Sequence, residues 1–267
     1  MKHLFLTLSL LVWLTASAQF KTIQNIPYSD DKDSYARERC KLDIYYNPET
    51  PKDSLLPVVV WFHGGGLTGG EKFIPDELKE SGFVVIAPNY RLLPKSTIDQ
   101  TIDDAAAAVA WTFKNAENYG GDPAKVFVSG HSAGGYLSSM IGFNKNYLNK
   151  YGIDADSIAG LFPYSGQAIT HFAIRKDKGI GELTPTIDEY SPMFHIRKDA
   201  PPYIIITGDA DMELFGRYEE NLYLWRMLKL MGHPDVKIFK LDGYDHGAMA
   251  VPAHHIMKNE IRRLLNK

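Results

Sequence analysis

The stretch VSGHSAGGYL, residues 128–137, carries the strongest structural signal in the chain. Ser132 lies between Gly130 and Gly134, after a strand-like apolar run and before a segment with the pattern of a helix. A tight turn from strand to helix has no room for a Cβ beside its apex, because that atom would collide with the opposite arm of the turn. The stretch therefore predicts a nucleophile elbow, a turn that exposes the Ser132 hydroxyl at the edge of a sheet.

Residues 1–18 have the pattern of a cleaved secretory signal peptide. Lys2 precedes the apolar run 4–14, and the small residues Ala16 and Ala18 predict cleavage after Ala18. The run is about 11 residues long, whereas a membrane span needs roughly 20, so we expect no stable membrane anchor. No cysteine lies near the cleavage site to carry a lipid. We therefore expect a secreted or periplasmic protein.

Removal of this segment leaves residues 19–267, 249 in all, which we expect to form a single domain. The whole sequence has 29 basic and 32 acidic residues and a formal net charge of −3, which argues against nucleic acid as a partner. Cys40 is the sole cysteine, so no internal disulfide is possible, and we expect it in a buried strand. The sequence leaves the oligomeric state open.

Strand-like and helix-like segments alternate along the rest of the chain. Residues 37–47 alternate in polarity, as a half-buried antiparallel strand does. Continuous apolar runs, typical of parallel strands buried on both faces, occupy residues 57–62, 82–88, 125–130, 157–163 and 202–208. Helical patterns occupy residues 75–81, 103–119, 134–144 and 216–232. This order predicts an α/β fold, a mostly parallel central sheet with helices on both faces and reactive groups beyond the carboxyl ends of its strands.

Three successive glycines follow the first of these parallel strands, in HGGGLTGG, residues 63–70. Glycines at the end of a strand let the backbone turn its N–H groups toward a substrate, as an oxyanion binder requires. A flexible surface loop is the alternative for a glycine-rich stretch taken alone. Its combination with GHSAG, residues 130–134, favours the oxyanion-binding loop.

With HGGG upstream of GHSAG, the sequence resembles the α/β-hydrolases, and more narrowly the esterases that carry an HGGG oxyanion loop: hormone-sensitive-lipase-like, acetyl and feruloyl esterases. Supporting stretches are NYRLLP at 89–94, GGDPAKVFVSGHSAGG at 120–135 and GYDHGAM at 243–249. The resemblance covers nearly all of residues 19–267. It implies a catalytic triad in the chain order serine, acid, histidine.

The triad acid is expected just beyond the strand at 202–208, where Asp209, Asp211 and Glu213 compete. In related hydrolases this loop commonly reads Gly-x-x-acid, and the count from Gly208 assigns Asp211. Asp209 is the alternative. For Glu213 the expectation is a place at the start of the following helix, where a carboxylate favours the helix dipole.

The triad base is expected to be His246, in a glycine-flanked loop near the end of the chain. His254 and His255 lie on a terminal helical pattern and are expected at the surface or in packing. We interpret His63 as a hydrogen-bonding residue that shapes the oxyanion loop. His131, next to the nucleophile in sequence, is expected to point away from the Ser132 hydroxyl.

These assignments predict nucleophilic catalysis. His246 accepts the proton of Ser132 as its hydroxyl attacks an acyl carbonyl, and Asp211 orients the imidazole and stabilises the imidazolium. Water then releases the acyl-enzyme, and the chemistry requires no metal or organic cofactor. The oxyanion is expected to be held by the backbone N–H groups of Gly65, Gly66 and Ala133.

About 38 residues, 164–201, separate two of the expected strands, and we interpret them as a lid or binding excursion. Gln167, His171 and Phe172 are expected to contact the substrate, and Tyr164 and Arg175 are further candidates. Ordinary packing of a surface segment is the alternative for each of these residues.

The resemblance implies a serine esterase, and the predicted export suggests acetyl or feruloyl esters on plant polysaccharide fragments as substrates. An arylformamidase or a small peptidase of the same fold is the alternative enzyme. A non-catalytic binding module is the alternative outside enzymes. The reaction of Ser132 with a fluorophosphonate probe distinguishes the enzymes from the binding module.

Overall fold

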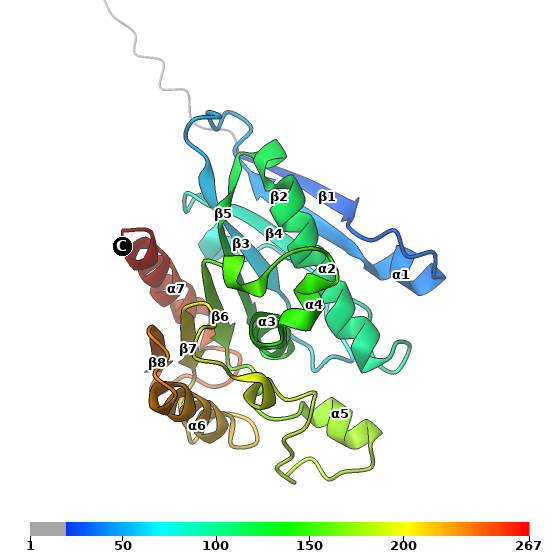
Figure 1. The fold of residues 1–267 in the computed structure, drawn as a ribbon, viewed down its shortest axis with the longest axis vertical. Helices are drawn as coiled ribbons and strands as arrows, with labels where there is room; N and C mark the ends of the chain where they lie inside the picture. The colour runs from blue at the N-terminus through cyan, green and yellow to red at the C-terminus, as the bar shows by residue number, and fades with distance from the viewer. Residues whose placement is uncertain (1–19, 267) are drawn as a thin grey trace, which may run out of the picture.

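The computed structural model describes residues 20–266, which form one eight-stranded sheet flanked by helices (Figure 1). The strand order is β1-β2-β4-β3-β5-β6-β7-β8. The strands are β1 (Lys21–Pro27), β2 (Lys41–Tyr46), β3 (Leu56–Phe62), β4 (Val84–Pro88), β5 (Gly121–His131), β6 (Gly160–Tyr164), β7 (Tyr203–Thr207) and β8 (Val236–Lys240). Strand β2 runs antiparallel to β1 and β4, and all other neighbours are parallel. The predicted mostly parallel α/β sheet is confirmed.

The central strands are apolar because both faces of the sheet are covered. All five residues of β4, VVIAP, and all five of β7, YIIIT, are buried. Successive side chains of a strand point to opposite faces. Accordingly, Val58 and Val60 of β3 pack in one hydrophobic cluster, while Val59 and Trp61 pack in another. The sheet therefore separates two cores.

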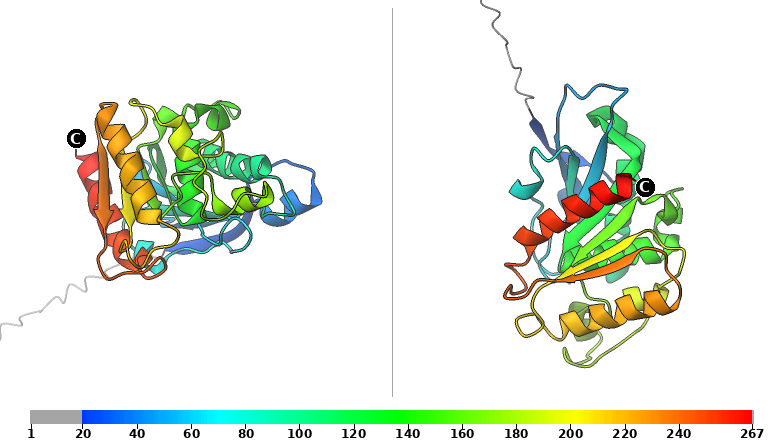
Figure 2. Two further views of the ribbon diagram at one scale, coloured as in Figure 1. Left: turned by 90° about the horizontal axis from the view of Figure 1, so that it is seen from below. Right: turned by 90° about the vertical axis from the view of Figure 1, so that its left-hand side faces the viewer.

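Long helices cover the two faces. The larger core includes residues of α2 (Ile98–Asn115), α3 (Ala133–Phe143) and α6 (Arg217–Leu230). The smaller core includes residues of α7 (Ala250–Leu265), which crosses the opposite face of the sheet (Figure 2). Shorter elements are α1 (Ser34–Arg39), α4 (Lys145–Asn149), α5 (Phe172–Asp177) and the 3₁₀ turns η1 (Asp76–Leu78), η2 (Ala116–Tyr119), η3 (Ala155–Ser157) and η4 (Pro192–His195).

Two expected elements differ in the structure. The first part of the strand expected at 37–47 belongs to helix α1, whose N-terminal N–H groups are capped by the Asp33 carboxylate. The helix expected at 75–81 is only the single turn η1. Glu80 has a φ of 52°, in the left-handed region, and a helix cannot continue through that conformation.

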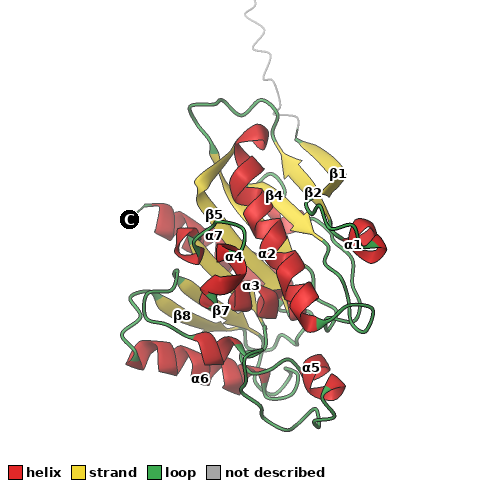
Figure 3. Ribbon diagram, turned by 45° about the vertical axis from the view of Figure 1, so that its right-hand side comes forward, coloured by secondary structure: helices red, strands yellow, loops and turns green. Residues whose placement is uncertain are grey.

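The segment between β6 and β7 contains α5, η4 and connecting loops, and it lies beside α6 (Figure 3). Asn221 of α6 donates a hydrogen bond to the Gly166 carbonyl at 2.8 Å. The Tyr136 hydroxyl of α3 donates to the Tyr190 carbonyl at 2.7 Å. The expected excursion is therefore fixed to two helices of the larger core.

The predicted signal peptide, residues 1–18, lies outside the described residues. Within residues 20–266, no helix combines the length and the hydropathy that a membrane crossing needs.

Candidate active site

Ser132 sits at the apex between β5 and α3 with a φ of 56° and a ψ of −113°, a strained conformation for a residue with a side chain. A Cβ on Gly130 would lie 2.5 Å from the Gly134 carbonyl carbon, and a Cβ on Gly134 would collide with the Phe62 carbonyl of β3. The glycine before the serine thus makes room for the opposite arm of the turn, as predicted. The one after it makes room for the neighbouring strand.

His246 bridges the serine and a carboxylate. Its Nε2 lies 2.9 Å from Ser132 Oγ, and its Nδ1 lies 2.7 Å from Glu213 Oε2. A carboxylate accepts hydrogen bonds, so this arrangement favours the tautomer with the proton on Nδ1 and leaves Nε2 free to accept the proton of the serine. Three segments far apart in the sequence therefore meet in one hydrogen-bonded chain.

The carboxylate in this chain is Glu213, so the assignment of Asp211 is wrong. A turn follows β7, in which the Glu213 N–H donates to the Asp209 carbonyl at 2.9 Å and brings the glutamate back over the end of the strand. Asp211 lies exposed on this turn. The loop after β7, residues 208–216, is called the acid loop, and the loop after β8, residues 241–249, is called the histidine loop. The alternative acid, Asp209, accepts a hydrogen bond from the Gly243 N–H at 2.7 Å and so connects the two loops.

The carboxylate of Glu213 is almost completely buried, with 1% of its side chain exposed. Its Oε1 accepts hydrogen bonds from the Gly208 N–H at 2.9 Å and from the Ser165 hydroxyl. Burial alone raises the pKa of a carboxyl, but the hydrogen bonds from His246 and Ser165 outweigh it and lower the pKa of Glu213 to about 2. The acid is therefore ionised at neutral pH.

Two further histidines support the loops around the serine. His131 Nε2 lies 2.6 Å from the His246 carbonyl oxygen, and the two imidazole rings have centroids 4.8 Å apart, so the His131 ring contacts the histidine loop. His63 is 2% exposed, and its Nδ1 lies 2.6 Å from the Gly64 carbonyl oxygen. Its ring stacks on Tyr90 with centroids 4.4 Å apart. These contacts match the expected role of His63 in shaping the glycine loop.

The glycine loop runs beside the nucleophile. A Cβ on Gly64 would lie 3.4 Å from Ser132 Cβ, and the φ angles of Gly65 and Gly66 are 111° and 64°. Ala133 is the first residue of α3, and the first N–H groups of a helix have no acceptor within it. The Gly65, Gly66 and Ala133 amides as oxyanion donors stay a prediction.

Two of the three expected substrate contacts are buried in the fold, and their assignment is corrected. Gln167 is 1% exposed, and its Oε1 accepts the Phe172 N–H at 2.8 Å. His171 has no exposed surface, and its Nδ1 accepts the Ala173 N–H at 3.2 Å. Both side chains therefore stabilise the start of α5, a role that a local sequence pattern does not reveal.

Phe172 alone of the three reaches the surface. It helps to line a cavity of about 480 Å³, together with Thr68, Leu93, Pro94 and Ala173. Thr68 belongs to the glycine-rich loop, and a Cβ on Gly66 would lie 3.0 Å from the Phe172 ring. This cavity therefore adjoins the expected oxyanion loop.

Comparisons with known proteins show which sequences and folds this chain is similar to. Residues 42–168 match the family model described as BD-FAE. The chain is 29% identical over 194 residues to a probable carboxylic ester hydrolase, LipM, of Mycobacterium tuberculosis, covering 64% of this chain and 44% of the relative. It is 34% identical over 202 residues to a probable isoprenylcysteine alpha-carbonyl methylesterase of Arabidopsis thaliana, covering 66% and 47%. The chain thus spans less than half of either relative.

Solved structures share the fold over most of the chain. A structure described as a truncated carbohydrate esterase from gut microbiota superposes with a TM-score of 0.76 at 19% identity, covering 92% of this chain and 97% of the other. A propionate-bound esterase from Thermogutta terrifontis superposes with a TM-score of 0.71 at 20% identity, covering 92% and 94%. Within residues 20–266, no group of three or more His, Cys, Asp or Glu side chains is placed to hold a metal ion.

Proposed function

Because this chain is an α/β-hydrolase related to carboxylesterases, we propose that it hydrolyses carboxylic esters with Ser132, His246 and Glu213. The observation that carries the proposal is the hydrogen-bonded chain from Ser132 Oγ through the imidazole to the Glu213 carboxylate, at 2.9 and 2.7 Å. A serine hydroxyl is a weak nucleophile at neutral pH, and an adjacent base oriented by a third group activates it.

The mechanism follows from the positions of these groups. Ser132 Oγ attacks the acyl carbonyl, and its proton passes to His246 Nε2. The Glu213 carboxylate, ionised because its pKa lies near 2, stabilises the imidazolium that forms. The tetrahedral intermediate collapses as His246 returns the proton to the departing alcohol. Water then attacks the acyl-enzyme by the same route and releases the acid.

The negative oxygen of the intermediate needs donors that do not move during the reaction. The proposed donors are the N–H groups of Gly65, Gly66 and Ala133, each contributing roughly 3 kcal/mol to stabilisation of the transition state. The Ser132 N–H is not among them, because it donates to the Tyr164 carbonyl at 2.8 Å.

For the substrate we propose acetyl or feruloyl esters on plant polysaccharide fragments. The cavity of about 480 Å³ beside Phe172 has the size of a small-molecule pocket, and it combines apolar walls with Lys176, Asp177 and Glu182. An aromatic acyl group suits the apolar wall, and sugar hydroxyls suit the charged side chains. A solved protein with the same fold is described as a carbohydrate esterase.

We further propose that the chain is exported, because residues 1–18 have the pattern of a signal peptide. N-terminal sequencing of the protein recovered outside the cytoplasm tests this. Cleavage after Ala18 gives a mature chain that begins at Gln19. A protein that is retained in the cytoplasm with Met1 contradicts the proposal.

The catalytic proposal is tested by labelling and by turnover. A fluorophosphonate probe is expected to add its mass to the peptide that contains Ser132, and the label is expected to be absent from Ser132→Ala. A panel of p-nitrophenyl acetate, butyrate and octanoate, methyl ferulate and acetylated xylo-oligosaccharides then identifies the preferred ester. A folded wild-type protein that neither reacts with the probe nor hydrolyses any ester would instead be a binding module.

A further inference from the structure

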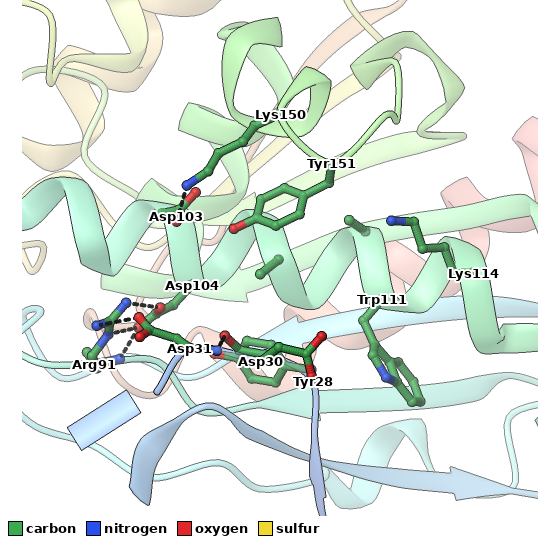
Figure 4. Close-up of a pocket in the computed structure, with 13 residues that line it drawn as sticks. Tyr28, Asp30, Asp31, Arg91, Asp103, Asp104, Trp111, Lys114, Lys150 and Tyr151 are labelled. Carbon is green, nitrogen blue, oxygen red and sulfur yellow. Dashed lines mark hydrogen bonds and ion pairs between the residues drawn. The ribbon is translucent and has the colours of Figure 1, made fainter. Parts of the chain in front are cut away.

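A second cavity, of about 470 Å³, lies apart from the proposed catalytic residues (Figure 4). Its walls come from the segment between β1 and α1, from Arg91 after β4, from α2, and from residues 150–151 after α4. No lining residue belongs to the glycine loop, to the acid loop or to the histidine loop. None of the proposed catalytic steps therefore involves this cavity.

Aromatic and aliphatic groups form much of its surface. Tyr151 lies on one side and Tyr28 on the opposite side, while Trp111 lies toward one end (Figure 4). Ala107 and Ala110 of α2 also line the cavity with small side chains. The cavity therefore offers flat apolar faces to a ligand of moderate size.

The charged groups around the cavity nearly balance. Arg91 Nη2 lies 2.6 Å from Asp104 Oδ1, and Arg91 Nη1 lies 3.2 Å from Asp31 Oδ2. Lys150 Nζ lies 2.6 Å from Asp103 Oδ2. The two charged lining residues outside these pairs are Asp30 and Lys114, one of each sign. A strongly charged ligand would therefore meet a group of its own sign, whereas a neutral ligand meets both donors and acceptors.

We propose that this cavity binds a neutral sugar unit. A pyranose ring has an apolar C–H face, which can pack on the rings of Trp111 and Tyr151. It also has a rim of hydroxyls that donate and accept hydrogen bonds, and Asp30 and Lys114 supply charged partners for them. The sugar site lies apart from the serine, so it holds a saccharide without placing an ester bond at Ser132.

A sugar site apart from Ser132 would let the protein bind a polymeric substrate at two places. Binding of one sugar segment raises the effective concentration of neighbouring segments at the active site. This consequence rests on the proposed esterase function. The binding of sugar itself does not, because it requires no reaction.

The binding test uses the full mature chain with Ser132→Ala, so that no turnover occurs. Unesterified xylohexaose, cellohexaose and mannohexaose are titrated by calorimetry. We expect saturable binding of at least one of them, weakened at least about tenfold by Trp111→Ala, since aromatic anchors dominate such contacts. Trp225→Ala is the matched control, because Trp225 is also half-buried but lies on α6. Asp30→Ala, an exposed change that spares the core, should also weaken binding.

A turnover test then uses the catalytically intact chain. Trp111→Ala is expected to leave hydrolysis of p-nitrophenyl acetate unchanged and to lower hydrolysis of an acetylated polysaccharide severalfold. The sugar site is refuted if no oligosaccharide binds, or if neither the Trp111→Ala variant nor the Asp30→Ala variant weakens binding. It is also refuted if spermidine or a uronic-acid oligomer binds more tightly than the neutral sugars. Sugar binding without any ester hydrolysis would refute the proposed function and leave the sugar site standing.

Discussion

The side chain of Glu213 is buried and keeps its charge because each carboxylate oxygen has a donor. Oε2 faces His246 Nδ1, while Oε1 accepts from Gly208 N–H and from Ser165. Burial of an unpaired carboxylate would be strongly unfavourable, so these partners are a condition of the arrangement. Arg217, 1% exposed, donates to the Ser165 carbonyl and fixes the residue that supports Glu213. Orientation of the imidazole thus depends on a small buried network.

Replacement of this acid should disable catalysis while leaving the nucleophile in place. Glu213→Gln keeps the size of the side chain but removes the charge that stabilises the imidazolium and selects its tautomer. We expect kcat/KM for p-nitrophenyl acetate to fall by about 10⁴, by analogy with removal of the triad acid in other hydrolases. Initial rates of the purified variant at neutral pH provide the measurement.

Asp211→Asn is the matched control, because this exposed residue lies on the same turn. Its activity should stay within about twofold of the wild type, since exposed substitutions away from such contacts change little. A large loss of kcat/KM in Asp211→Asn together with full activity in Glu213→Gln would show that the hydrogen bond between Glu213 and His246 does not contribute to catalysis.

His63 links the oxyanion loop to the pH dependence of stability. Burial lowers the pKa of His63 to about 4, and the nearby Arg39 acts in the same direction. In the unfolded chain the pKa of histidine lies near 6.5. Between these two values the unfolded state binds a proton that the folded state does not, so stability falls as the pH is lowered.

Because of His63 alone, we expect the free energy of unfolding to fall by about 3 kcal/mol as the pH is lowered from 6.5 to 4. His63→Asn keeps a donor near the Gly64 carbonyl but removes the titration, so its stability should decrease less over that interval, even if it is lower at pH 7. Urea unfolding at a series of pH values measures the difference. His255→Asn, at an exposed position of α7, is the control and should follow the wild type. Parallel curves for His63→Asn and wild type would refute this account.

At the scale of elements, the site is assembled from the ends of parallel strands. The glycine loop follows β3, the nucleophile follows β5, the acid follows β7 and the histidine loop follows β8. Parallel strands present their carboxyl ends at one edge of a sheet, so these loops converge without any long reach of the chain. Asp209 joins the last two through its contact with Gly243 N–H.

The sequence was informative where a residue type has one physical use. Gly130 and Gly134 around Ser132 specified the elbow, and the apolar runs specified the parallel strands. Selection of Glu213 over Asp211 depended on the turn that begins at Asp209, and a count from Gly208 carries no information about that turn. Strand β1 was missed because most of its residues are exposed at the edge of the sheet, so it lacks the apolar pattern of a core strand.

The excursion that contains α5 is expected to select substrates through Phe172. The ring adjoins Gly66 and lines the cavity of about 480 Å³. Phe172→Ala would remove apolar contact worth roughly 1 to 3 kcal/mol with a bulky aromatic or glycosyl ester, and almost none with a small acetate ester. The ratio of kcat/KM for methyl ferulate and p-nitrophenyl acetate measures this selectivity.

Phe194→Ala provides a control in the same excursion, because Phe194 is 60% exposed on η4 and does not line the cavity. Its selectivity ratio should match the wild type. Equal losses of both activities in Phe172→Ala would mean that the residue supports the fold or the triad, and the excursion would then not be the specificity element.

At the scale of the whole molecule, two hydrophobic cores share one sheet. Trp61, 1% exposed, lies in the core beneath α7, whereas α2 packs on the opposite face. A buried ion pair fixes α2 to the chain after β4: Arg91 Nε and Nη2 lie 2.8 and 2.6 Å from the two Asp104 carboxylate oxygens. Every central strand contributes side chains to both cores. Neither core can therefore lose its packing without disruption of the sheet that both share.

We therefore expect residues 19–267 to unfold as one cooperative unit. Asp104→Asn leaves Arg91 with a weakened buried partner and should destabilise the protein by about 3 kcal/mol, although it touches only the α2 face. In a Trp111→Phe, Trp225→Phe background, guanidinium unfolding is followed by Trp61 fluorescence and by far-ultraviolet circular dichroism. Both midpoints should shift equally, because coincident transitions mark two-state unfolding. An Asp104→Asn midpoint that moves by circular dichroism but not by Trp61 fluorescence would show that the two faces unfold separately, and the expectation of a single domain would be wrong.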